Sequence, residues 1–408
     1  MESVLAFLTL WAAVLLAVPV HAIATLSEEH APHNPRGGPL APKVFIISMF
    51  DEEGDVWFGL PQLNVLANNI TVPGFSPLFP QAHCTVDGAV CQVTTGEGEI
   101  NAAVTISSLT SSSLFNLRNT YFLIAGVAGI SPTIGTIGSV TFARFAVQVG
   151  LQQEIDAREI PSNFSTGYFP QGAEAPTQFP TSIYGTEVFE LNDNLRQLAI
   201  SFAKTATLFD DDASKSYRAH YASNSAFAIG AAGPSIVACD TATSDQFWSG
   251  ELLASAFENA TRLFTNGQGT YCTTQQEDNA TLEALLRAAI AGRVDFSRII
   301  TMRSGSDFDR PFAGQTVLQN LLVGFPGIAP SLANLRLAGL PVVQGIVNGW
   351  SHTFARGVKP NNYIGDIFGS LGGQPTFGPG SIFGGKTAPV RRRSGRRASR
   401  TLVSSGSA

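Results

Sequence analysis

Apolar runs that suit buried strands alternate along the chain with stretches that have helical spacing. Runs with the length and residue types of buried strands lie at 43–50, 91–98, 120–129, 138–150 and 296–304. Apolar residues recur with helical spacing over 99–112, 190–205, 244–264 and 273–292. Because strands alternate with helices, and several strands are apolar on both faces, the pattern predicts an α/β fold. We expect a single domain with a twisted, mostly parallel or mixed central sheet flanked by helices.

The N-terminal end of the chain departs from this alternation. Residues 4–18 form an apolar run that is too short for a comfortable membrane span, and the small-residue signal Val20-His21-Ala22 ends it. This pattern predicts a cleaved secretory signal peptide over 1–22, with a signal anchor as the alternative. Residues 23–42 are rich in Pro, His and Gly and are expected to form a flexible leader.

The C-terminal end also changes character. Residues 386–408 carry seven Lys and Arg side chains and no acid among Ser and Gly, which predicts a disordered basic tail. The tail could fold back on the acidic body, or it could bind a nucleic acid or a wall polymer. The folded domain is then expected over 43–385. The net charge of −6 does not favour nucleic acid as a partner of the whole chain. No later stretch has 18 uninterrupted apolar residues, so we expect no transmembrane span in the mature chain.

Four sequons and four cysteines agree with a secreted or cell-surface protein. The triplets for N-glycosylation begin at Asn69, Asn163, Asn259 and Asn279.

The cysteines predict two disulfides. Cys84 and Cys91 flank Asp87-Gly88, a strong two-residue hairpin turn. Counting outward from that turn places the two sulfurs opposite each other, at a separation that a disulfide can bridge. Cys239 and Cys272 are then the expected second pair, with free buried thiols as the alternative.

Polar residues or glycines stand at the ends of several of the predicted strands. Glu53 comes after the first strand, Gly96 after the second and Gly126 within the glycine-rich end of the third. Arg303 and Asp307 come after FSRIIT, the apolar part of the last strand, together with Ser306, which stands between them. Ligands of open α/β sheets bind beyond the carboxyl ends of the strands, so these residues are candidates for one site. The alternative is that they are polar simply because loops face water.

The order of several motifs resembles the nucleoside phosphorylase and nucleosidase superfamily. Segments similar to those of bacterial methylthioadenosine/S-adenosylhomocysteine nucleosidases are, in chain order, IISMFDEEGDVW, TTGEGEINAAVTISSL, FLIAGVAGISPTIGTIGSV, SDQF, TQQEDNATLEAL and MRSGSD. The full chain, including FARFAVQVGLQQEIDAREIP and its secretory start, is similar to the fungal purine nucleoside permeases. The resemblance implies a nucleoside phosphorylase-like single domain and a purine nucleoside as ligand.

The resemblance also implies a role for each matched residue. Asp307 matches the aspartate that protonates the purine N7 as the glycosidic bond breaks, and Glu53 matches the glutamate that orients the attacking water. Arg303 matches an arginine near the base edge, Glu277 the glutamate that holds the ribose hydroxyls, and Phe247 the ring stacked on the base. The further positions expected at the substrate are Ser306, Gly126 and Gly96.

These roles fit the chemistry of N-glycosidic bond cleavage. Cleavage builds oxocarbenium-like positive charge on the ribose and negative charge on the leaving base. An acid can neutralise the leaving base by protonation, and a carboxylate at the ribose hydroxyls favours the positive charge. A ring over the base adds contact area and orientation.

The chain also departs from the family pattern. Phosphorylases of this kind hold phosphate with a serine and an arginine, where this chain has Val127 and Ile124. Neither side chain can donate to a phosphate ion, which needs several donors or cations, so hydrolysis is favoured over phosphorolysis. The acid-Met-Glu trio of the nucleosidases is Gln275-Gln276-Glu277 here.

Each candidate also has a purely structural interpretation. Glu277 could be a helix-surface acid, and Glu53 could be solvated like its neighbours. Arg303 and Asp307 could form a structural ion pair. Phe247 and Trp248 could belong to the core.

Two functions follow from the sequence. One is a secreted purine nucleosidase that cleaves the N-glycosidic bond by hydrolysis. The other is an uptake component that binds nucleosides without chemistry and assists a separate membrane carrier; a retired enzyme fold is a third reading. A homo-oligomer is expected from the resemblance alone. We expect no cofactor. We also expect no metal, because His83, His220 and His352 lack metal-ligand spacing.

Overall fold

A computed structural model of the protein describes residues 38–377. The predicted signal peptide (1–22), most of the predicted leader (23–42), the end of the predicted domain (43–385) and the basic tail (386–408) lie outside the described residues. Those predictions stay predictions.

Thirteen strands form one mixed sheet, and two more form a separate hairpin. The path through the large sheet is β15-β10-β7-β12-β13-β5-β1-β4-β3-β2, with β14 joined to β5 and β6, and β11 joined to β6. The strands are β1 (Val44–Ser48), β2 (Asn68–Thr71), β3 (Gln81–Cys84), β4 (Val90–Thr94), β5 (Tyr121–Ile130), β6 (Val140–Ala143), β7 (Phe145–Gln148), β8 (Gln152–Glu154), β9 (Tyr168–Pro170), β10 (Val188–Glu190), β11 (Ile236–Ala238), β12 (Asp240–Thr243), β13 (Tyr271–Gln275), β14 (Ile299–Phe308) and β15 (Gly365–Asp366).

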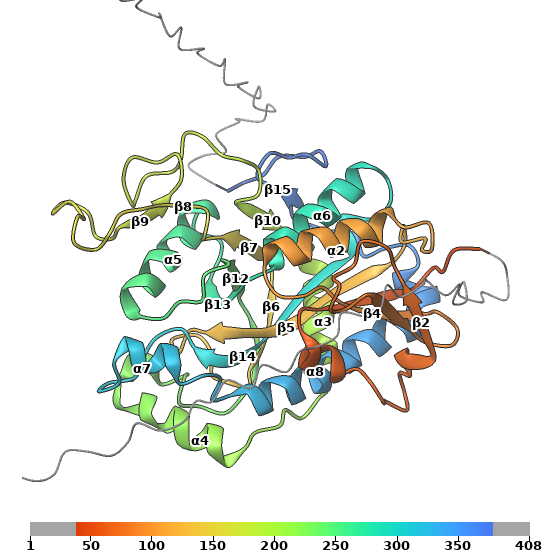
Figure 1. Cartoon of the computed structure of the whole chain (residues 1–408), viewed down its shortest axis with the longest axis horizontal. Helices are drawn as coiled ribbons and strands as arrows, with labels where there is room; N and C mark the ends of the chain where they lie inside the picture. The colour runs from red at the N-terminus through yellow and green to blue at the C-terminus, as the bar shows by residue number, and fades with distance from the viewer. Residues whose placement is uncertain (1–37, 378–408) are drawn as a thin grey trace, which may run out of the picture.

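Helices cover both faces of the central strands (Figure 1). They are α1 (Asp51–Asp55), α2 (Glu99–Ser111), α3 (Asp193–Ala203), α4 (Asp212–Arg218), α5 (Glu251–Phe264), α6 (Asp278–Ile290), α7 (Val317–Leu322) and α8 (Ile328–Asn348). The predicted α/β class, with a mixed central sheet flanked by helices in a single domain, is confirmed.

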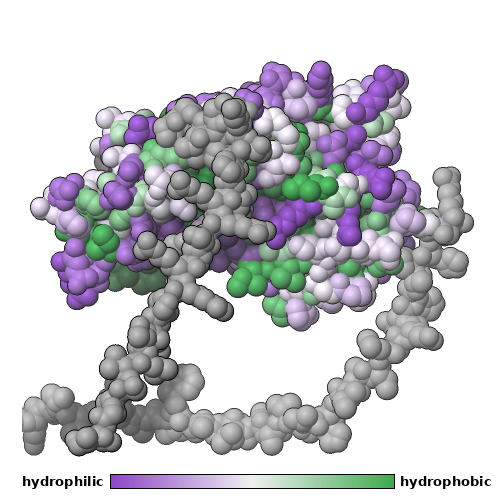
Figure 2. Space-filling view, turned by 90° about the horizontal axis from the view of Figure 1, so that it is seen from above, coloured by the Kyte–Doolittle hydropathy of each residue, from purple (hydrophilic) through white to green (hydrophobic). Residues whose placement is uncertain are grey.

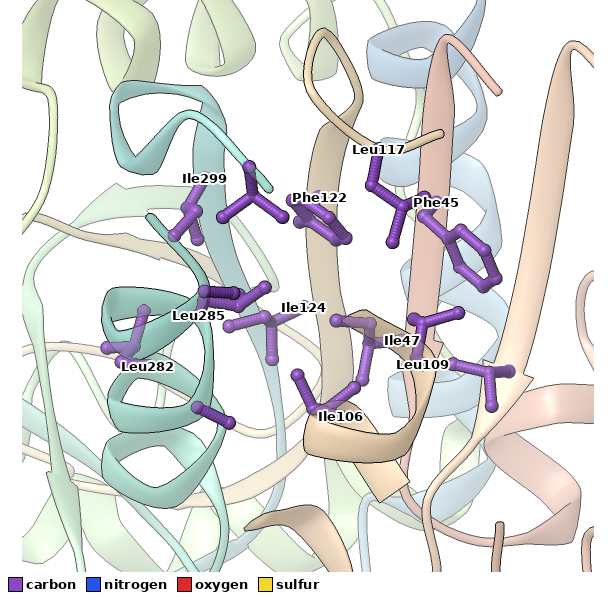
Figure 3. Packing of buried hydrophobic residues seen from close by; sticks show 14 of the residues in the cluster. Phe45, Ile47, Ile106, Leu109, Leu117, Phe122, Ile124, Leu282, Leu285 and Ile299 are labelled. Atoms are coloured by element: carbon purple, nitrogen blue, oxygen red, sulfur yellow. The ribbon is translucent and has the colours of Figure 1, made fainter. Parts of the chain in front are cut away.

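The central strands are apolar on both faces because each face packs on a different helix layer. On β1, Phe45 and Ile47 face the core under α2 and α6, whereas Val44 and Ile46 face the core under α3 and α8. This is the two-residue alternation of a strand buried on both sides. Figure 3 shows the first of these cores, in which side chains of β1 and β5 meet those of α2 and α6.

The strand β14 pairs with β5 in parallel along its whole length. The register sets Arg303 beside Gly126 and Asp307 beside Gly129, with a bulge between Gly305 and Asp307. Neighbouring residues of a regular strand point to opposite faces, and a bulge breaks that rule locally. The consequence is that both Ser306 and Asp307 line the same cavity, which is described below.

Three predicted elements were wrong in type or extent. The segment 273–292 is not one helix, because Tyr271–Gln275 is strand β13 and the helix begins only at Asp278. The segment 244–264 begins with an irregular stretch, and α5 starts at Glu251. The strand predicted over 138–150 is broken at Arg144, where the backbone turns from β6 into β7.

The polar residues at the end of the last strand also differ from expectation. Arg303, Ser306 and Asp307 do not follow the strand but belong to it, because β14 runs on to Phe308. Pairing with β5 and β6 holds this polar stretch in strand conformation despite its Gly and Ser residues. The structure also contains a long helix, α8, which the hydrophobic pattern did not predict.

Both predicted disulfides are present. Cys84 and Cys91 are paired across the β3–β4 ladder, as the hairpin count predicted. Cys239 and Cys272 form the second bridge, which excludes the alternative of free thiols among the described residues.

The surface mixes polar and apolar side chains, and Figure 2 shows them interspersed over one face. Within residues 38–377, no helix is long and apolar enough to cross a membrane. Of the four sequon asparagines, Asn69 and Asn163 are exposed and Asn259 is half-buried. Asn279 is buried and bonded to Thr243 and Thr186, so its amide has no room for a glycan.

Candidate functional site

A cavity of about 370 Å³ opens where β5 and β14 run past the start of α1 and past the residues that directly precede α6. Its volume falls in the range of small-molecule sites. Six of the predicted site residues line it, namely Glu53, Phe247, Glu277, Arg303, Ser306 and Asp307. A larger groove of about 690 Å³ beside α7 is more open, and none of the predicted site residues lines it.

Two predicted site residues, Gly96 and Gly126, do not line this cavity. Gly126 lies directly behind it. A Cβ atom there would stand 2.7 Å from Glu53 Oε1 and 2.7 Å from Arg303 Nη1, so only glycine lets both groups approach the strand. Gly96 has φ +84° and lies against Asn101, so its role is to form the turn before α2.

Arg303 is the anchor of the site. Its side chain is about 2% exposed, and its Nη2 atom donates to Asp278 Oδ1 at 2.6 Å and to Glu277 Oε2 at 3.1 Å. Its Nη1 atom donates to the carbonyl of Val127 at 3.0 Å. Burial alone would lower the pKa of Arg303, but Asp278 and Glu277 more than offset that effect and raise it. A structural ion pair therefore exists, but it joins Arg303 to Glu277 and Asp278 and not to Asp307.

Glu53 is held by the backbone on both of its oxygens. Oε2 accepts from the Met49 amide at 2.7 Å, and Oε1 accepts from the Val127 amide at 2.6 Å. The residue is 1% exposed, which rules out the alternative of a solvated surface acid. Burial raises the pKa of Glu53 to about 8, with Arg303 acting in the opposite direction.

Glu277 is positioned at the start of α6 by its neighbours. Its Oε1 accepts from the Gly98 amide at 3.0 Å, and the residue is buried. Gln275 accepts from the amides of Glu277 and Asp278, so its side chain satisfies the first amide of the helix. Burial raises the pKa of Glu277, and Arg303 counteracts this. The alternative of a plain surface acid does not hold.

Asp307 has a different environment, because no cation contacts it. Its Oδ1 accepts from the Ser306 hydroxyl at 2.8 Å, and the residue is 8% exposed. Burial raises the pKa of Asp307 to about 6, with the hydrogen bond from Ser306 acting in the opposite direction. A carboxyl group with such a pKa can hold and release a proton near neutral pH.

The two ends of the cavity are chemically distinct. In the β5–β14 register, Gly126 at the Glu53 end and Gly129 at the Asp307 end are three residues apart, or about 10 Å at 3.3 Å per residue. That spacing separates the group of Glu53, Glu277 and Arg303 from the lone carboxyl of Asp307.

Two half-exposed aromatic rings flank the cavity. Phe247 and Phe325 are 49% and 48% exposed and meet edge to face at 5.9 Å between centroids. Both line the cavity, so Phe247 is not a core residue. Trp248 beside it is buried against Phe257, as the core interpretation predicted.

The sequence did not identify Asp278, Gln275 or Phe325 as parts of the site. A second acid directly after Glu277, at the start of an apolar helix, was a signal for Asp278. Nothing in the local pattern pointed to Phe325, since its place depends on the path between α7 and α8.

Metal binding finds no support in the geometry. Over residues 38–377, no group of three or more His, Cys, Asp or Glu side chains is placed to share a metal ion. The absence of a metal stays a prediction.

The chain belongs to the purine nucleoside permease family, whose model matches residues 41–359. This confirms the family predicted from the order of the motifs. The chain is 43% identical to a purine nucleoside permease of Candida albicans over 370 residues, covering 88% of this chain and 89% of the relative. It is 45% identical to a probable purine nucleoside permease of Schizosaccharomyces pombe, covering 76% of this chain and 90% of the relative.

Among solved structures, the chain is similar to a 5′-methylthioadenosine/S-adenosylhomocysteine nucleosidase from Neisseria meningitidis. The match has 12% identity and a TM-score of 0.45, and it covers 75% of this chain and 99% of that chain.

The raised pKa of Asp307 predicts a stability difference that depends on pH. Its folded-state pKa of about 6 lies above the ordinary 3.8, so the folded state loses stability as the pH rises from about 4 to about 6. The variant Asp307→Asn avoids that loss because its amide stays neutral. We expect it to be more stable than the wild type by about 1–3 kcal/mol at pH 8 and equal at pH 4, by urea unfolding. The control Asp212→Asn, at an exposed position of α4, should show no such difference. Equal stability of Asp307→Asn and wild type at both pH values would contradict the raised pKa of Asp307.

Proposed function

We propose that the protein is a secreted purine nucleosidase, which binds a purine nucleoside in this cavity and hydrolyses its N-glycosidic bond. The observation that carries the proposal is the placing of Asp307 and Glu53 at opposite ends of one cavity. Both are buried carboxyl groups with raised pKa values. The family supplies the substrate class, because its name and those of the relatives refer to purine nucleosides.

Asp307 is the proposed general acid. The negative charge that develops on the leaving base is removed when a proton passes from the Asp307 carboxyl to the purine N7. With a pKa of about 6, roughly a tenth of the Asp307 carboxyl groups carry that proton at pH 7. The purine would lie at the Asp307 end, where Phe247 and Phe325 offer ring surfaces.

Glu277 and Glu53 act at the ribose. Each oxygen of Glu277 accepts one hydrogen bond from the protein, from Gly98 or from Arg303, and keeps a lone pair for a ribose hydroxyl. Its partial negative charge favours the oxocarbenium-like sugar of the transition state. Glu53, fixed by two backbone amides, orients a water molecule and takes its proton as it attacks.

Water is the proposed nucleophile because the site offers little to an inorganic phosphate. Val127 lines the cavity with an apolar side chain, and its amide already donates to Glu53. Ile124 is fully buried in the core. The guanidinium of Arg303 is matched by two carboxylates and a carbonyl.

A second candidate function is nucleoside uptake without chemistry, which the word permease in the names of the family and its relatives favours. In that case the same cavity would bind the nucleoside and deliver it to a separate membrane carrier. The predicted carrier and the predicted homo-oligomer stay predictions.

Base release tests the two functions against each other. Purified full-length protein incubated with inosine, adenosine or guanosine should release free base, at the same rate with and without phosphate, as measured by liquid chromatography. Asp307→Asn should lower the rate at least about 100-fold, because it removes the general acid. Asp212→Asn is the control that should leave the rate unchanged. Tight nucleoside binding with no base released would favour the uptake component instead.

The pH profile tests the assignment of the acid and the base. Asp307 must be protonated and Glu53 ionised, and their pKa values are about 6 and about 8. Below about pH 6, kcat/KM should rise with pH as Glu53 ionises. Between about 6 and 8, the gain in ionised Glu53 cancels the loss of protonated Asp307, and above about 8 the loss dominates.

Asp307→Asn gives this profile a diagnostic change. Its residual activity should rise with pH up to about 8 and then level off, because only Glu53 still titrates. A variant that keeps the wild-type break near pH 6 would show that Asp307 is not the acid.

A further inference from the structure

The cavity is lined almost entirely by one sign of charge. Six of its lining side chains are carboxyl groups, and of the described residues that line it only Arg303 is a cation. Three of the acids are exposed, namely Asp51, Glu52 and Glu97. Asp51 and Glu52 directly precede Glu53, and Glu97 directly precedes the turn that donates to Glu277. The exposed acids therefore lie beside the Glu53 and Glu277 end, where the sugar is expected.

The guanidinium of Arg303, the cation of this lining, already donates to protein oxygens. Arg303 Nη2 donates to Asp278 and Glu277, and Nη1 donates to the Val127 carbonyl. Its Nε atom is shut off from solvent and makes no hydrogen bond. Both terminal nitrogens thus already donate to protein oxygens and Nε is buried, so the guanidinium offers little to a phosphate ester.

Several backbone amides around the cavity already donate to protein side chains. The glycine turn before α2 has the form of an anion cradle, but the Gly98 amide donates to Glu277 and the Glu99 amide to Asp245. The amides of Met49 and Val127 donate to Glu53.

The start of α6 is occupied in the same way. The amide of Glu277, just before the helix, and that of Asp278, its first residue, both donate to the side chain of Gln275. These backbone donors are thus filled by the protein's own carboxylates and by one side-chain amide, and they are not available to a phosphate group. By contrast, Asp307 lines the cavity and is 8% exposed, and its Oδ2 atom makes no hydrogen bond to the protein. This oxygen is therefore available to a ligand.

We propose that this site accepts nucleosides whose 5′ side is neutral or positively charged and rejects nucleoside phosphates, with Glu52 and Glu97 as the selecting residues at its mouth. The proposal rests on the proposed nucleoside site. It places the protein after a phosphomonoester hydrolysis, in which water converts a nucleoside monophosphate to a nucleoside and inorganic phosphate. The protein cannot draw on nucleotides directly, so a phosphomonoesterase must supply its substrate.

Binding of three matched ligands tests whether the site selects by charge at the 5′ side of the nucleoside. Adenosine, adenosine 5′-monophosphate and 5′-amino-5′-deoxyadenosine differ in charge at the 5′ position. Their dissociation constants are measured by calorimetry on full-length Asp307→Asn, and base release is followed with the wild type. At low salt we expect the monophosphate to bind weaker than adenosine by on the order of a hundredfold, and the amine to bind at least as tightly as adenosine. Added salt should narrow the gap, because exposed charges are screened.

Variants locate the source of the selection. The double variant Glu52→Gln/Glu97→Gln should narrow the gap between adenosine and its monophosphate by about tenfold, mainly by improving the monophosphate. The matched control Glu159→Gln/Glu174→Gln removes two exposed acids from the segment around the β8–β9 hairpin, which does not line the cavity, and should leave the gap unchanged. Thermal unfolding checks that both variants fold.

The outcomes separate this inference from the function on which it rests. If the dissociation constant of the monophosphate lay within about threefold of that of adenosine, the proposed rejection of nucleoside phosphates would be overturned and the nucleoside site would stand. If Glu52→Gln/Glu97→Gln left the difference in affinity between adenosine and its monophosphate unchanged, the proposed role of Glu52 and Glu97 would be overturned. If neither Asp307→Asn nor the wild type bound any of the three ligands, both the nucleoside site and this inference would be overturned.

Discussion

The buried guanidinium of Arg303 holds together the elements that form the cavity. It belongs to β14, donates to the carboxylates of Asp278 and Glu277 at the start of α6, and donates to the carbonyl of Val127 in β5. A charge taken out of water is costly unless it is paired and hydrogen-bonded, so these contacts depend on one another. Removing one partner of such a buried pair costs roughly 3–5 kcal/mol. The geometry of the site is therefore coupled to the stability of the sheet around it.

This arrangement also divides the carboxyl groups by environment. Glu277 accepts a hydrogen bond from Arg303, and Glu53 accepts hydrogen bonds from two backbone amides. Asp307 accepts one only from the hydroxyl of Ser306. Groups of the same chemical type thus differ in their readiness to hold a proton, which is how one site can supply both an acid and a base. The bulge in β14 contributes as well, because it turns both Ser306 and Asp307 towards the cavity.

The sequence predicted those parts of the structure whose pattern is local. The β3–β4 disulfide followed from one turn, and β1 and β5 followed from apolar runs of strand length. Residues 273–275 at the end of strand β13 were taken as the start of the helix that follows, and only their pairing with β12 and β5 shows that they are strand. The helix α8 was missed because Pro341 and Gly339 normally interrupt helices. Tertiary packing overrides them here, since a Cβ atom at Gly339 would meet Trp57 and Met302.

The candidate site was predictable for similar reasons. Asp307 and Glu277 lie in motifs that resemble a known family, whereas the pairing of Arg303 with Asp278 depends on the distance between β14 and α6. Similarly, Phe325 reaches the cavity only through the chain path between α7 and α8, which no local pattern encodes.

The most direct test of this account is a crystal structure of the Asp307→Asn variant soaked with inosine. The account predicts an intact nucleoside in the cavity, with the purine N7 within hydrogen-bond distance of the side chain at position 307 and the ribose hydroxyls at Glu277. A nucleoside bound elsewhere, or one turned so that its ribose faces position 307, would contradict it.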